Sequence, residues 1–151
     1  PRACCNYPSL KSGNYGLDTS NLIPKEQIIS ALAPYHNFES IEPADLDKLC
    51  VGINGLLSMC EFGLDELIGM KKLTIRCLSD YRDWNAIAYS IGFIDLETLN
   101  MWYCELTEIP QSFERLINLK RLCFTGNDIS EIPQWITSRV RSDELYFVQQ
   151  S

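Results

Sequence analysis

Two stretches of the chain decide its fold: residues 96–106 read LETLNMWYCEL, and residues 119–129 read LKRLCFTGNDI. Each stretch has apolar residues at its first, fourth, sixth and eleventh positions, with a Cys or an Asn at the ninth. The second stretch begins 23 residues after the first, and both are followed by Glu-Ile-Pro-Gln. A pattern that recurs at a period of roughly 20–50 residues predicts a stack of similar structural units.

The physical meaning of the pattern is direct. Alternating apolar residues predict a short strand that buries one face and exposes the other. The Asn or Cys falls in the turn after the strand, where an Asn side chain can satisfy buried backbone groups of neighbouring turns. The chain then returns with a second apolar stripe, and a single unit cannot bury that stripe alone. The units must therefore stack.

The same frame extends beyond these two units. Residues 46–56 fill all five positions, residues 70–75 fill the first three, and residues 142–147 give a last partial strand. The pattern resembles that of the leucine-rich-repeat family. This resemblance implies an α/β solenoid, a short right-handed horseshoe segment with parallel strands on the concave face and helices or 3-10 turns on the convex face. We expect repeats over residues 46–151, with units beginning near 46, 70, 96, 119 and 142.

The remaining segments predict helices. Apolar residues at helical spacing predict a helix over 79–91, with Asp80 or Asp83 as its cap, and shorter helical turns near 113–116 and 136–140. Residues 1–45 do not fit the repeat, but Pro24–Ala33 predicts a helix capped by Asn21. We therefore expect residues 1–45 to form a helical N-terminal cap, with some flexibility in about the first 20 residues.

Composition and net charge argue against several classes of function. The chain has 151 residues and a formal net charge of -7, which argues against a general nucleic-acid binder and against binding to anionic membranes. It has 7 cysteines without a Cys-x-x-Cys pair, and its only histidine is His36. We expect buried, reduced thiols and a cytoplasmic location, although secretion or delivery into a host cell stays open. A bridge from Cys4 or Cys5 also stays open.

The sequence contains no pattern that predicts catalysis. His36 is far in sequence from Cys50 and Cys123, so no Cys–His nucleophile is indicated. A glycine-rich phosphate loop and paired metal ligands at short spacing are likewise missing from the sequence. We expect a protein that is not an enzyme and that has no cofactor and no metal.

The resemblance implies that ligands bind on the concave face, at the variable positions between the apolar strand residues. The expected partner-binding residues are Lys48, Lys72, Thr74, Arg76, Thr98, Asn100, Trp102, Arg121, Thr125 and Tyr146, with Cys50, Cys123, Glu144 and Val148 completing the face. The basic residues favour an acidic or phosphorylated partner surface, unless they serve solubility alone. An outward Trp102 is typical of a binding hot spot.

The first hypothesis for function is a protein–protein interaction module that uses this concave face. Two alternatives stay open. The chain could be an inhibitor or immunity-type protein against a toxin or enzyme, or the recognition fragment of a larger receptor or secreted bacterial effector.

Overall fold

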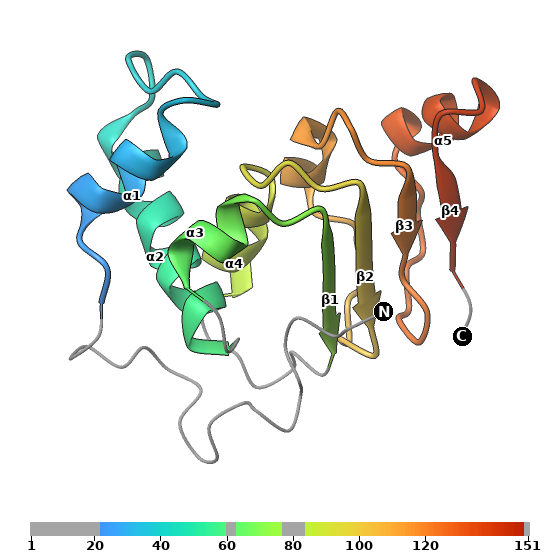
Figure 1. Cartoon of the computed structure of the whole chain (residues 1–151). Helices are drawn as coiled ribbons and strands as arrows, with labels where there is room; N and C mark the ends of the chain where they lie inside the picture. The colour runs from blue at the N-terminus through green and yellow to red at the C-terminus, as the bar shows by residue number, and fades with distance from the viewer. Residues whose placement is uncertain (1–21, 60–62, 77–83, 150–151) are drawn as a thin grey trace.

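The computed structural model describes residues 22–59, 63–76 and 84–149. Within these residues, four parallel strands pair in chain order: β1 (Lys72–Arg76), β2 (Thr98–Trp102), β3 (Arg121–Cys123) and β4 (Tyr146–Val148) (Figure 1). Neighbouring parallel strands cannot be joined by a tight turn, so each pair needs a longer crossover. The four strands lie within the units that the sequence pattern places near 70, 96, 119 and 142.

The strands share one register across the sheet. Leu73 stands opposite Leu99, and Leu99 stands opposite Leu122. All three side chains are fully buried. Because side chains alternate between the two faces of a strand, this register points the whole apolar set of each strand to the same side. The opposite side, here called the outer face, carries the variable residues.

A layer of helical elements lies in the crossovers. It consists of α4 (Trp84–Ile91), the 3-10 helix η3 (Gln111–Arg115) and α5 (Gln134–Arg141) (Figure 1). Its fully buried side chains include Ile87, Phe113 and Ile136, and the Phe113 ring centroid lies 6.2 Å from that of Phe124 after β3. The helical turns are thus found where the sequence predicts them. The predicted caps Asp80 and Asp83 lie outside the described residues.

Three helices precede the sheet: α1 (Lys25–Leu32), α2 (Pro43–Met59) and α3 (Leu64–Ile68). The predicted helix near Pro24–Ala33 is therefore present, although its proposed cap Asn21 lies outside the described residues. In Figure 1 these helices lie beside β1, at the start of the sheet. They contribute Ile28, Leu49 and Leu67 to the same hydrophobic core as the strands.

The strand predicted for the unit at 46 is wrong, because residues 46–56 belong to α2. Leu49, Ile53 and Leu56 are fully buried, and their spacing of four and three residues fits one helix face. Val51, which the strand pattern needs inside, is 37% exposed. A helix buries more of these apolar side chains than a strand would. The helical segment before the sheet therefore extends to Ile68, well past the expected boundary at residue 45.

Packing of α2 against α4 depends on Gly52. A Cβ atom built on Gly52 would lie 2.0 Å from the backbone oxygen of Ala86 and 2.7 Å from Cβ of Ser90. Real side-chain atoms do not approach a backbone oxygen so closely. The two helix backbones therefore touch at this point, and only glycine fits between them.

The buried turn after β3 is organised by Asn127, which is 5% exposed. Its Oδ1 accepts hydrogen bonds from the backbone N–H groups of Cys104 (2.9 Å) and Leu106 (3.1 Å). Its Nδ2 donates to the carbonyls of Met101 (2.7 Å) and Phe124 (3.0 Å). This amide thus ties one turn to the preceding one, as the repeat pattern predicts.

Cys104 occupies the equivalent position one unit earlier, with its Sγ 3.3 Å from the carbonyl oxygen of Trp102. Cys50, Cys104 and Cys123 are buried free thiols, which agrees with the expectation for these three. The other four cysteines lie outside the described residues.

In the described ranges, no helix is long and apolar enough to cross a membrane, and no group of His, Cys, Asp and Glu side chains could hold a metal ion.

We predict that Gly52→Ala destabilises the protein. The substitution gains up to about 1 kcal/mol of helix propensity, but overpacking costs about 1–3 kcal/mol and a 2.0 Å approach puts this site at the high end. Urea unfolding should show a net loss of about 1–2 kcal/mol. Gly63→Ala is the control, since a Cβ at Gly63 meets nothing within 4 Å. Equal stability of the two variants would contradict the close contact.

We also predict that Asn127→Ala lowers the free energy of unfolding by about 2–4 kcal/mol, because each buried polar group left unpaired costs about 1–3 kcal/mol. Thermal or urea unfolding measures the loss. Asp128→Ala changes an exposed neighbour and should stay within about 0.5 kcal/mol of the wild type. A loss below about 1 kcal/mol for Asn127→Ala would show that the turns do not depend on this amide.

Candidate functional site

The strand register sorts the predicted partner-binding residues into rows on the outer face. Lys72, Thr98, Arg121 and Tyr146 lie at the amino ends of the strands, and Thr74, Asn100, Cys123 and Val148 form the middle row. Arg76 and Trp102 lie opposite each other at the carboxyl ends, and Thr125 comes shortly after β3. The sequence pattern does not distinguish these positions, but their exposure differs from row to row.

The row at the amino ends is accessible. Lys72, Arg121 and Tyr146 are exposed, and Thr98 is partly exposed. The Arg121 guanidinium carbon lies 4.9 Å from the centroid of the Tyr146 ring, which is 59% exposed. This cation–π contact orders two long side chains on the surface. Tyr and Arg are also residue types enriched at binding hot spots.

Except for the partly exposed Val148, the middle row is not accessible, which corrects the prediction for Thr74, Asn100 and Cys123. These side chains are only 1%, 4% and 5% exposed. They are short residues between rows of longer ones, and their polar atoms have partners within the protein. Asn100 Nδ2 donates a hydrogen bond to Thr74 Oγ1 (3.1 Å), and Cys123 Sγ lies 3.1 Å from Thr125 Oγ1. These three buried side chains pack within the sheet.

At the carboxyl ends of the strands, Trp102 is only partly exposed, and the exposed aromatic is its neighbour Tyr103. Tyr103 has a φ of 54°, a left-handed conformation that non-glycine residues rarely adopt. Its ring lies over Gly126, where a Cβ would be 2.3 Å from a ring carbon. The guanidinium of Arg76 lies 5.2 Å from the ring centroid. Tyr103 is thus held by two neighbouring units, so its role includes packing.

Lys48 is not part of the outer face, because it lies on α2. Its Nζ sits 5.1 Å from the centroid of the Tyr89 ring, on α4. Lys48 lines a groove of about 820 Å³ that runs between α4, η3 and the segment 105–110. The groove carries cations and carboxylates together, among them Arg115 and Glu108. The wrong strand assignment for residues 46–56 explains both misplaced residues, Lys48 and Cys50.

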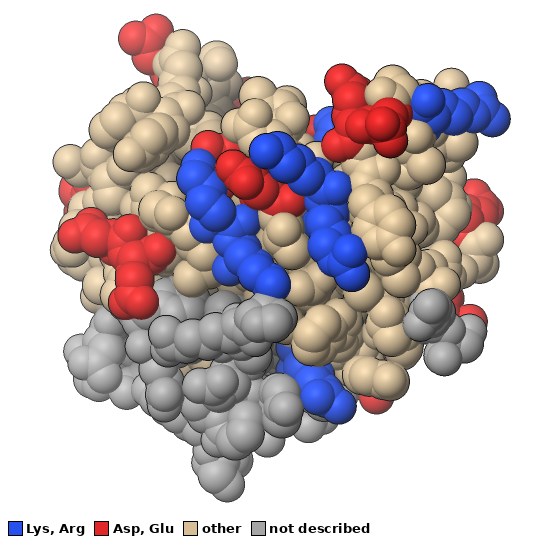
Figure 2. Space-filling model, turned by 45° about the vertical axis from the view of Figure 1, so that its right-hand side comes forward, with Lys and Arg blue, Asp and Glu red and all other residues tan. Residues whose placement is uncertain are grey.

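A basic surface forms where the strands begin. It contains two pairs of cations at equivalent places, Lys71 and Lys72 before and on β1, and Lys120 and Arg121 before and on β3. We call these four residues the strand-start patch. Figure 2 shows Lys and Arg side chains gathered around a few acidic ones on the face turned toward the viewer.

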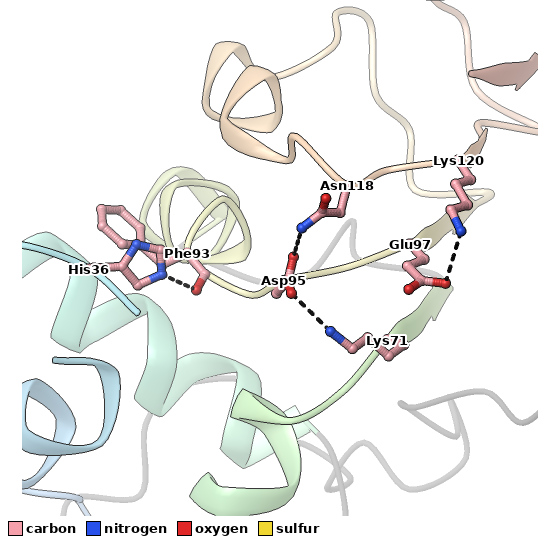
Figure 3. A network of polar contacts seen from close by, with 7 residues as sticks. All are labelled: His36, Lys71, Phe93, Asp95, Glu97, Asn118 and Lys120. Carbon is pink, nitrogen blue, oxygen red and sulfur yellow. Dashed lines mark hydrogen bonds and ion pairs between the residues drawn. The ribbon is translucent and has the colours of Figure 1, made fainter. Parts of the chain in front are cut away.

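A hydrogen-bonded network orders the acidic residues beside the patch (Figure 3). Asp95 accepts hydrogen bonds from Asn118 Nδ2 (2.7 Å) and Lys71 Nζ (2.8 Å). The bond from Asn118 and then the bond from Lys71 lower the pKa of Asp95 below its usual value. Lys120 Nζ lies 3.9 Å from Glu97 Oε1.

The ion pairs of the network are exposed, so they contribute little to stability. Their main effect is to hold Lys71 and Lys120 in place. In the part of the chain that the structure describes, Lys72 and Arg121 form no salt bridge, and both are exposed. Their charges are therefore available to a partner.

The repeat pattern does not indicate Lys71, Lys120 or the network residues, because it marks only positions between the strand leucines. The sequence does contain a feature that indicates this patch. The pairs Lys-Lys at 71–72 and Lys-Arg at 120–121 occupy the same place in their units, with Glu-Thr at 97–98 between them. Aligning the units on their strands would have brought these charges together.

Comparison with known proteins agrees with the sequence pattern. The family model for the Leucine Rich Repeat matches residues 95–116, which run from Asp95 through β2 to Leu116. The searches of curated proteins and of solved structures each gave no match. Leucine-rich repeats generally mediate protein–protein interactions, and the family is typically non-enzymatic. The pattern and the match agree that residues 95–116 of this chain are similar to a leucine-rich repeat.

Proposed function

We propose that this chain is a protein-interaction module, a short solenoid segment that binds an acidic protein surface over its strand-start patch. The observation that carries the proposal is the grouping of four cations at the starts of the first and third strands in a chain whose net charge is -7. Charges that serve only solubility need not gather at equivalent positions of different units. A basic surface on an acidic protein attracts acidic partners and repels basic ones.

Exposure on the outer face supports this location. Thr74, Asn100 and Cys123 of the middle row are buried, whereas Lys72 and Arg121 at the amino ends of the strands are exposed. Arg121 and Tyr146 stack on each other and present an ordered aromatic and cationic pair. Thr98 lies between Lys72 and Arg121 in the register and leaves space for a partner group. Carboxylates and phosphates would both suit these donors.

The proposal includes the location and the absence of catalysis. Buried free thiols at Cys50, Cys104 and Cys123 suit a reducing compartment such as the cytoplasm. Binding without catalysis fits a surface whose charges are exposed, because catalytic groups generally need a more enclosed site with strongly shifted pKa values.

Site-specific cross-linking tests the proposal. A photoreactive amino acid at Thr98, in the centre of the patch, should capture a partner in a lysate of the source organism. Arg121→Glu should reduce the captured amount on the order of tenfold, since it places a negative charge opposite an acidic surface. Added salt should weaken capture as well.

Lys48→Glu is the matched control, because it makes the same change of charge on α2, away from the patch. It should leave capture at the wild-type level. Capture that falls equally in both variants, or that does not respond to Arg121→Glu, would contradict the proposed surface. The partner's identity also separates the alternatives, since an inhibitor requires a captured toxin or enzyme whose activity falls on binding.

A further inference from the structure

A hollow of about 460 Å³ lies at the edge of the strand-start patch. Three segments that are far apart in the sequence border it: the turn after α1, the turn after α4, and the end of η3 with the residues that follow it. They contribute Tyr35 and His36, Phe93 and Asp95, and Arg115 and Ile117, respectively. Its volume lies within the roughly 300–1,000 Å³ typical of ligand pockets.

The rim of the hollow exposes apolar surface. Ile117 is 81% exposed and Tyr35 is 68% exposed, the highest values among the large hydrophobic side chains of the described residues. Both lie at this one hollow. Single exposed apolar residues are ordinary on protein surfaces, but two of them around a concave site indicate a place where another apolar group is buried.

The walls of the hollow are ordered without a ligand. His36 Nε2 donates a hydrogen bond to the backbone carbonyl of Phe93 (2.9 Å), and the two rings pack edge to face with centroids 5.1 Å apart. The guanidinium of Arg115 lies 4.0 Å from the Phe93 ring centroid. An incoming side chain therefore meets a site that is largely formed, which lowers the entropy cost of binding.

The hollow continues into the strand-start patch. Asp95 and Asn118 line the hollow and are hydrogen-bonded to each other, and Asp95 is bound in turn by Lys71 of the patch (Figure 3). An occupant that fills the hollow thus extends directly over Lys71, with the other cations of the patch beyond it. Charge complementarity selects an occupant with carboxylates next to its apolar group.

We propose that the hollow receives one apolar side chain, of the leucine, isoleucine or phenylalanine type, from an acidic segment of the partner protein. The carboxylates of that segment lie over the strand-start patch. The inference rests on the proposed function and deepens it, because it names the kind of segment that the patch binds. The patch supplies attraction, and the hollow selects the position of the segment by burying its apolar residue.

Short fluorescein-labelled peptides test this inference by fluorescence anisotropy with the full chain. All peptides carry the same acidic residues around one central position, which is leucine in one peptide and serine in the other. The leucine peptide should bind at least tenfold more tightly, a difference of about 1.4 kcal/mol. The variant Tyr35→Ser/Ile117→Ser should remove this difference. Both side chains are mostly exposed, so the fold should persist.

Ile132→Ser is the matched control, because Ile132 is another exposed apolar residue (39%) and does not line the hollow. It should retain the preference for leucine. Equal binding of the two peptides, with both lost in Arg121→Glu, would overturn the hollow and leave the proposed function intact. No binding of either peptide would also overturn the inference, and cross-linking from Thr98 would then decide the proposed function separately.

Discussion

Leu73, Leu99 and Leu122 stand opposite one another on neighbouring strands, and the order of the rest of the structure depends on that register. With one face of every strand committed to the core, a slip of one residue would expose the whole apolar set. The same register aligns the residues of the outer face. Residues at equal places in different units therefore lie side by side, and charges separated by tens of residues in the sequence form one surface.

The register needs support in the turns, where backbone groups would otherwise be buried without partners. Asn127 meets this need with an amide that both donates and accepts, and so joins its own turn to the one before. Cys104 at the equivalent position has only a weak sulfur donor, which lies 3.3 Å from the carbonyl oxygen of Trp102 and 3.6 Å from that of Ile75 on β1. The backbone N–H of Cys104 is satisfied by the next unit, because it donates to Asn127.

Strand positions were predictable from the sequence because two units carry the full pattern and fix the frame for the others. The failure at residues 46–56 has a physical cause. Apolar spacings of three and four residues occur both in this strand pattern and on a helix face, and a helix buries Leu49, Ile53 and Leu56 together. Val51 alone distinguishes the two alternatives, since only the strand would bury it.

The candidate site was predictable only in part. The variable strand positions do lie on one face, but sequence alone does not reveal that short residues in the middle of that face, such as Thr74 and Asn100, are buried. The patch needs the alignment of units, which brings Lys71 and Lys120 to equivalent places. The hollow could not be predicted, because Tyr35 and Ile117 come from segments whose proximity depends on the packing of α1 and α2.

Patch and hollow would contribute differently to binding. Exposed ion pairs give at most about 1 kcal/mol each and are screened over about 8–10 Å at physiological salt, so the patch acts mainly on the rate and orientation of encounter. Burial of one leucine-sized side chain contributes about 1.5–3 kcal/mol and is hardly weakened by salt. Charges alone would hold many acidic proteins weakly. The hollow lies next to those charges and receives an apolar residue. Binding is therefore restricted to segments that match both the hollow and the patch.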